Sequence, residues 1–123
     1  IYANAVVVDN IVYVSGMTAQ KFEDGSCTTN TMQDQMWVAL SKMKQVLEEA
    51  GSCLENVFKT FIMLKDIKDY PVMRATELKF YQEYAPELAE HPAASTILQA
   101  GCLARPEFLV EIECMAVLNR KKD

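Results

Sequence analysis

The sequence is poor in residues on which several common chemistries depend. Its 123 residues include a single histidine, His91, and three arginines, Arg74, Arg105 and Arg120. A structural zinc site needs clustered Cys and His ligands, and an H-E-x-x-H site needs two histidines. Both kinds of site are excluded. We expect His91, which directly precedes Pro92, to lie in a surface loop and not in a nucleophile–histidine couple.

Long apolar runs and excess positive charge are also missing. Fully apolar runs are only a few residues long, which predicts no membrane-spanning segment and no membrane partner. Twelve basic and 17 acidic residues give a net charge of −5 and a pI near 4.9. Proteins that bind nucleic acid usually carry a basic excess that releases counterions from phosphates, so we expect no nucleic-acid partner.

The four cysteines show no two-residue spacing, and no secretory signal is recognisable. They are Cys27, Cys53, Cys102 and Cys114. A chain of this size does not need disulfides for stability. We therefore expect reduced, mostly buried thiols in a cytoplasmic protein.

Half of the residues are apolar, which is enough to build one domain spanning residues 1–123. Two β-branched runs, Ala5–Val8 and Ile11–Ser15, flank Asp9-Asn10, a pair suited to a tight hairpin turn. From Thr31 to Ala50, Met and Leu recur every three or four residues, and Gly51 follows. This pattern predicts a long amphipathic helix capped by Asn30 or Thr31, with its apolar stripe in the core.

The rest of the chain completes an α+β pattern of order ββαβαββ. The further elements are a strand Val57–Leu64, a helix from Asp69 to about Tyr84, and strands Ser95–Ala100 and Leu109–Leu118. We expect a mixed or antiparallel sheet with two helices on one face. Alternation in Val57–Leu64 places Phe58 with Thr60, Ile62 and Leu64, yet both of its faces are apolar. With no third helix to cover the second face, the sequence predicts a homo-oligomer.

Two carboxylates stand out on the last strand. Glu111 and Glu113 share one face of an otherwise apolar segment. They are either solvated glutamates at a sheet rim or a carboxylate held in a subunit cleft, where burial raises its pKa for proton handling. Ser15-Gly16 has a similar ambiguity, because a glycine at a strand end either forms a turn or lets a ligand approach the backbone.

Several segments together resemble the RidA (YjgF-type) family of reactive-intermediate deaminases. They are Tyr2-Ala-Asn-Ala-Val, Ile11-Val-Tyr-Val-Ser-Gly, Ala50-Gly51, the stretch from Val57 to Tyr70, and Val110-Glu-Ile-Glu-Cys-Met-Ala. The resemblance covers essentially the whole chain. It implies a chorismate-mutase-like α+β fold and a homotrimer with three clefts between subunits.

The resemblance also implies a function, namely hydrolysis of small imines and enamines to a keto acid and ammonia without metal or organic cofactor. Glu111 matches the glutamate that positions water. Tyr2, Ser15, Gly16 and Thr96 match substrate-binding positions. The arginine that pairs with the substrate carboxylate is replaced by Ala94 in Pro92-Ala-Ala-Ser-Thr.

The loss of this arginine leaves three hypotheses. The first is a deaminase with an altered substrate, in which Arg74 or Arg105 supplies the charge. The second is a non-catalytic trimer that binds keto or imino acids. The third, an endoribonuclease, fits poorly with the acidic balance and the single histidine.

Overall fold

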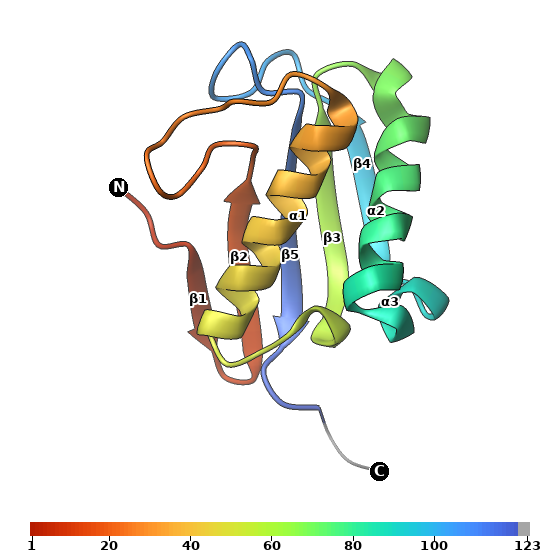
Figure 1. Cartoon of the computed structure of the whole chain (residues 1–123). Helices are drawn as coiled ribbons and strands as arrows, with labels where there is room; N and C mark the ends of the chain where they lie inside the picture. The colour runs from red at the N-terminus through yellow and green to blue at the C-terminus, as the bar shows by residue number, and fades with distance from the viewer. Residues whose placement is uncertain (121–123) are drawn as a thin grey trace.

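The computed structural model describes residues 1–120, which form one five-stranded sheet with helices packed against a single face (Figure 1). The strands are β1 (Ala5–Val8), β2 (Ile11–Met17), β3 (Val57–Leu64), β4 (Ala94–Gln99) and β5 (Val110–Val117). The helices are α1 (Met32–Glu49), α2 (Tyr70–Tyr84) and α3 (Pro86–Glu90), with short 3₁₀ turns at Leu54–Asn56 and Ile67–Asp69. The α+β class and the element order are confirmed, and α3 is an addition within the segment expected to be a loop.

The sheet is mixed, with the order β1-β2-β5-β3-β4. All neighbours are antiparallel except β3 and β4, which run parallel. Parallel neighbours need a crossover connection, and α2 with α3 supplies it. This arrangement places β4 at one edge of the sheet and β1 at the other.

Local sequence signals account for the ends of the first elements. Asp9 has a positive φ of 54° in the turn between β1 and β2. Thr31 caps α1 by accepting a hydrogen bond from the backbone N–H of Asp34. Gly51, at φ 90°, follows the helix in the left-handed conformation that glycine adopts without strain.

The core lies between the helices and the covered face of the sheet. The Met and Leu stripe of α1 is buried, as expected, with Met36, Leu40, Met43 and Leu47 fully inaccessible. Trp37 of α1 meets Phe80 of α2 edge to face, with ring centroids 4.9 Å apart. The stripe is therefore a packing surface between helix and sheet.

One prediction about β3 was wrong. Phe58 is 41% exposed, whereas Val57 is buried with Thr60, Ile62 and Leu64. The pairing of β3 with β5 shifts by one residue between Val57 and Lys59. Such a bulge interrupts the alternation of side chains and moves Phe58 away from the core.

The cysteine prediction holds only in part. All four thiols are free, but only Cys114 is buried and Cys102 is exposed. Burial raises the pKa of Cys114 to about 12, and the charge of Glu113 adds to this rise. Cys114 is therefore a protonated thiol in the core at neutral pH.

Gln35 ties two long loops to α1. Its side chain is fully buried and donates to the carbonyl oxygens of Thr29, at 3.0 Å, and Glu107, at 2.8 Å. It also accepts a 2.8 Å hydrogen bond from the N–H of Leu109. One amide thus pairs with three backbone groups in the two loops that precede α1 and β5.

We expect Gln35→Met to lower the free energy of unfolding by about 2 kcal/mol or more, because it removes three hydrogen bonds to the backbone of these loops. Urea denaturation followed by circular dichroism measures the change. Gln45→Met is the matched control on the same helix, since Gln45 is exposed and bonds only to Glu49. Equal stability of the two variants would contradict a tethering role for Gln35.

The second face of the sheet carries no helix within residues 1–120 (Figure 1). Tyr13 on β2 and Leu98 on β4 are 45% and 41% exposed there. Phe61, Met63 and Met115 on the same face are partly exposed. This is the apolar surface that the sequence predicted to need cover.

Candidate functional site

A cavity of about 370 Å³ collects four of the seven residues that we singled out from the sequence. Tyr2, Ser15, Gly16 and Glu111 all line it. The other lining residues are Met17, Thr18, Gln20, Phe22, Lys42, Ala104 and Phe108. We call this the Glu111 cavity.

The segment before β1 forms one wall because it is held against the end of β2. The Ser15 hydroxyl donates to the carbonyl oxygen of Ala3 at 2.6 Å, and the Ser15 N–H donates to that of Asn4 at 2.9 Å. These bonds fix the backbone next to Tyr2, whose ring stays 76% exposed at the mouth of the cavity. Ser15 thus both lines the Glu111 cavity and holds the segment before β1 in place.

Gly16 makes room for the carboxylate of Glu111. A Cβ atom at Gly16 would lie 2.7 Å from the carboxyl carbon of Glu111 and would overlap the carboxylate. The pairing between β2 and β5 is irregular from Val14 to Met17, and this irregularity brings Gly16 beside Glu111. Gly16 therefore lies within β2 and not in a turn, and its missing side chain leaves room for the Glu111 carboxylate.

Glu111 is a partly buried carboxylate whose surroundings favour its protonated form. Burial raises its pKa above the ordinary value, the negative charge of Glu113 raises it further, and Lys42 opposes both effects. A carboxylate with a raised pKa accepts protons more readily at neutral pH than an ordinary glutamate. A raised pKa thus suits Glu111 to exchange a proton with a bound molecule.

Lys42, from α1, is the residue of this cavity that sequence analysis missed. Its ammonium donates to the carbonyl oxygen of Thr18 at 2.9 Å and lies 4.7 Å from the centroid of the Phe22 ring. Burial lowers its pKa, and the negative charge of Glu111 opposes this shift. No local pattern marks a lysine on the flank of an amphipathic helix, so only the tertiary fold reveals it.

Thr96 is not part of the Glu111 cavity within one chain. It lies on β4, where its hydroxyl accepts a 2.7 Å hydrogen bond from Lys59. The strand β3 separates β4 from β5, with Phe61 paired between Thr96 and Glu113. Two strand spacings amount to about 10 Å, and Thr96 does not line this cavity.

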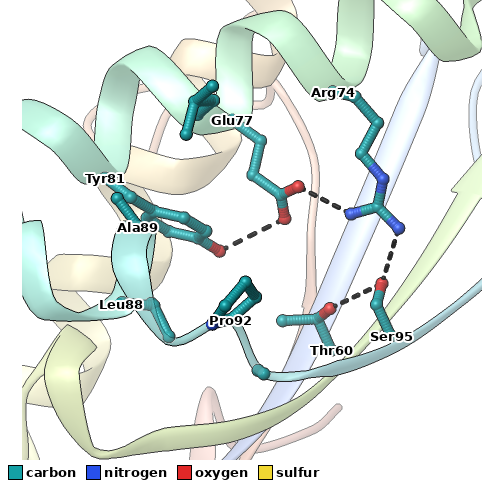
Figure 2. A pocket seen from close by; sticks show the side chains of 10 residues that line it. Thr60, Arg74, Glu77, Tyr81, Leu88, Ala89, Pro92 and Ser95 are labelled. Atoms are coloured by element: carbon teal, nitrogen blue, oxygen red, sulfur yellow. Dashed lines mark hydrogen bonds and ion pairs between the residues drawn. The ribbon is translucent and has the colours of Figure 1, made fainter.

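Arg74 lines a different cavity, which lies between α2, α3 and β4 (Figure 2). Its guanidinium forms a 2.6 Å ion pair with Glu77 and donates to the Ser95 hydroxyl at 3.0 Å. Glu77 in turn accepts a hydrogen bond from the buried Tyr81 hydroxyl. The structure thus separates Arg74 from Glu111 within the chain, but places it beside Ser95, the residue after Ala94.

Arg105 lies close to the rim of the Glu111 cavity without lining it. Its guanidinium pairs with Glu107 at 2.5 Å and donates to the carbonyl oxygen of Gly25 at 2.8 Å. It also lies 5.1 Å from the ring centroid of Phe108, which does line the cavity. Arg105 joins the two long loops, and its charge is already paired.

No helix within residues 1–120 is both long and apolar enough to cross a membrane. In the same range, no three His, Cys, Asp or Glu side chains are grouped so that they could hold a metal ion. His91 is exposed, as the sequence predicted.

Comparison with known proteins gives a consistent picture. The model of the family described as endoribonuclease L-PSP matches residues 1–118. The 3-aminoacrylate deaminase RutC of Acinetobacter baylyi is 35% identical over 94% of this chain and 85% of its own length. The 2-iminobutanoate/2-iminopropanoate deaminase of Dermatophagoides farinae is 30% identical over 96% of this chain and 86% of its own length.

Other relatives differ in length and compartment. Reactive Intermediate Deaminase A, chloroplastic, of Arabidopsis thaliana is 28% identical over 95% of this chain, which spans only 58% of that protein. A relative from Schizosaccharomyces pombe is named as mitochondrial. A cytoplasmic location therefore stays a prediction for this chain.

Solved structures agree with the sequence comparison. A YjgF-family protein from Neisseria meningitidis superposes with a TM-score of 0.80 at 28% identity, covering 98% of this chain and 89% of that one. The fold, the family model and the deaminase relatives all indicate the same family. The chain belongs to the endoribonuclease L-PSP family, which comprises the YjgF and RidA proteins.

Proposed function

We propose that the chain is a RidA-like hydrolase that releases ammonia from an imine or enamine in the Glu111 cavity. The observation that carries this proposal is the partly buried Glu111 carboxylate beside Gly16, in a cavity that also contains Tyr2 and Ser15. The names of the relatives support it, because they specify deamination of 3-aminoacrylate and of 2-iminopropanoate.

The proposed reaction adds one water across the C=N bond and releases ammonia, so that R₂C=NH and H₂O give R₂C=O and NH₃. Glu111 accepts a hydrogen bond from the water and takes its proton as oxygen attacks the imine carbon. Passing that proton to the nitrogen gives the carbinolamine R₂C(OH)NH₂. Glu111 then takes the hydroxyl proton and delivers it to the nitrogen as the C–N bond breaks, so that both protons of the water leave in ammonia. An enamine enters the same sequence after protonation of its carbon and loss of one N–H proton convert it to the imine.

We propose that substrate recognition differs from that of typical relatives, because Ala94 offers no charge to a carboxylate. Arg74 and Arg105 are the arginines predicted to replace the missing one, and each is already paired with a glutamate. To bind a substrate carboxylate, either arginine would have to share or give up its glutamate. Breaking that ion pair would offset part of the binding free energy gained from the substrate.

We also propose a homotrimer, with the clefts formed between subunits. Two features support this assembly, namely the apolar open face of the sheet and the distance of Thr96 from the Glu111 cavity of its own chain. Light scattering after size exclusion should give a mass three times that of the 13.9 kDa chain. A monomer at micromolar concentration would contradict the inter-subunit cleft.

Ammonia release from imines generated in place tests the activity itself. An amino acid oxidase with catalase produces 2-imino acids from amino acids, and semicarbazide competes for the free imine. We expect the chain to reduce semicarbazone formation and to accelerate ammonia release. The competing hypothesis, a non-catalytic binding trimer, predicts that 2-keto acids bind, as measured by calorimetry, with no acceleration for any imine offered.

RNA cleavage, which the family description names, is less well supported by this chain. The net charge is −5, and the only histidine, His91, is not among the residues that line the Glu111 cavity. Ribonuclease chemistry normally uses general acid–base groups next to a basic surface that binds phosphates. We therefore favour a small-molecule substrate.

A further inference from the structure

The Glu111 cavity contains one basic side chain, that of Lys42. Lys42 extends from α1 past the end of β2, where Thr18 accepts one of its N–H bonds. An ammonium has three N–H donors, so one bond to Thr18 and one contact with the Phe22 ring leave further donor capacity. A polar ligand in the cavity could use it.

Lys42 differs from both arginine candidates in having no carboxylate partner. The ion pairs found within residues 1–120 involve Lys44, Arg74, Arg105 and Arg120, and neither Lys42 nor Glu111 takes part in one. Lys42 and Glu111 nevertheless influence each other's charge across the cavity. The two opposite charges therefore face a shared space that can admit a small molecule between them.

A partly buried, unpaired ammonium loses hydration that no counter-ion replaces. An anion entering the cavity would restore that interaction, and the reduced local dielectric would strengthen it. Besides Glu111, the groups whose charge bears on the pKa of Lys42 are Cys27 and Glu23. Glu111 accepts water in the proposed reaction, so Lys42 is free to interact with the ligand's own negative group.

We propose that Lys42 is the anion-binding residue of the Glu111 cavity, where its ammonium binds the carboxylate of an imino or keto acid. The choice of ligand rests on the proposed function. In this arrangement the substrate carboxylate lies toward Lys42 and its C=N carbon toward Glu111. Lys42 then supplies, from within the same chain, the positive charge for the substrate carboxylate that Ala94 lacks.

The test compares a charged ligand with a neutral one of the same shape. Calorimetry would measure binding of pyruvate and of pyruvamide, its uncharged amide, to the wild-type protein and to Lys42→Met. We expect wild type to prefer pyruvate, and Lys42→Met to lose roughly ten- to hundredfold in pyruvate affinity, the usual loss for a hydrogen bond to a charged group. Pyruvamide affinity should not change.

Two further variants separate charge from structure. Lys42→Arg retains the charge and should keep most of the pyruvate affinity. Lys44→Met is the matched control, because Lys44 lies on the same helix and pairs with Glu48. Equal loss of pyruvate and pyruvamide in Lys42→Met would overturn the proposal, and so would a selective loss of pyruvate in Arg74→Met or Arg105→Met with none in Lys42→Met.

The outcomes also distinguish this inference from the proposed function. If pyruvate binding depends on Lys42 but wild type accelerates no imine hydrolysis, the anion site stands and the deaminase proposal fails. If wild type hydrolyses imino acids with a KM that Lys42→Met leaves unchanged, the deaminase proposal stands and the role of Lys42 is refuted. If wild type binds no pyruvate, the anion site is also refuted.

Discussion

Replacing Glu111 with glutamine should reduce kcat/KM for imine hydrolysis by about 10²- to 10⁴-fold, the usual contribution of a positioned general base. Glutamine keeps the size and polarity of the side chain but cannot take a proton from water. Ligand binding should change little, so the loss should appear in kcat. Steady-state ammonia release at saturating substrate, with calorimetry of a keto acid alongside, measures both quantities.

The same variant should be slightly more stable than wild type at neutral pH. The pKa of Glu111 is raised in the folded protein, mainly by burial, so folding disfavours its charged form. A carboxyl group with a raised pKa costs stability above that pKa, and the cost disappears as the pH falls through it. Glutamine removes this cost. Greater thermal stability together with lost activity is typical of a residue kept for function.

Glu113→Gln is the matched control for Glu111→Gln. Glu113 is two residues away on the same face of β5 and is exposed. Its charge raises the pKa of Glu111, so its removal should retain activity while moving the acidic limb of the pH–rate profile to lower pH. If Glu113→Gln abolished activity and Glu111→Gln retained it, the assignment of the base would be wrong.

The sequence was most informative about elements whose pattern is long and regular. The Met and Leu stripe predicted α1, and alternation along β5 placed Val110 and Ile112 in the core and Glu111 on the open face. Phe58 was misplaced because alternation alone cannot reveal a bulge, which depends on pairing with β5. Short α3 was missed because its five residues carry too little periodicity to distinguish a helix from a loop.

The candidate site was predictable only where its residues share a strand or a recognisable motif. Tyr2, Ser15, Gly16 and Glu111 meet in the cavity. Lys42 does not belong to any of those motifs, because its proximity to Glu111 arises from how α1 packs across the end of β2. Thr96 lies on the edge strand β4, and Arg74 on α2 bonds to Ser95 of the same strand, so both are separated from Glu111 by the strand order and not by distance along the chain.

Gly16→Ala should lower kcat/KM by about a hundredfold, the loss associated with displacing a catalytic group by roughly 1 Å. The added methyl group would overlap the carboxylate of Glu111, which is the free end of a flexible side chain and can move away. The φ angle of Gly16 is not positive, so alanine adds no backbone strain. The fold should therefore persist while the carboxylate is displaced.

Gly101→Ala is the control for this variant. Gly101 also has no positive φ, and no atom lies within 4 Å of the position its Cβ would occupy. Both variants should unfold at nearly the wild-type temperature in calorimetric scans, but only Gly16→Ala should lose activity. Full activity in Gly16→Ala would mean that the carboxylate position beside Gly16 is not the reactive one. A large drop in stability would instead make Gly16 a packing residue, because moving the partly buried Glu111 carboxylate does not by itself disturb the contacts of the core.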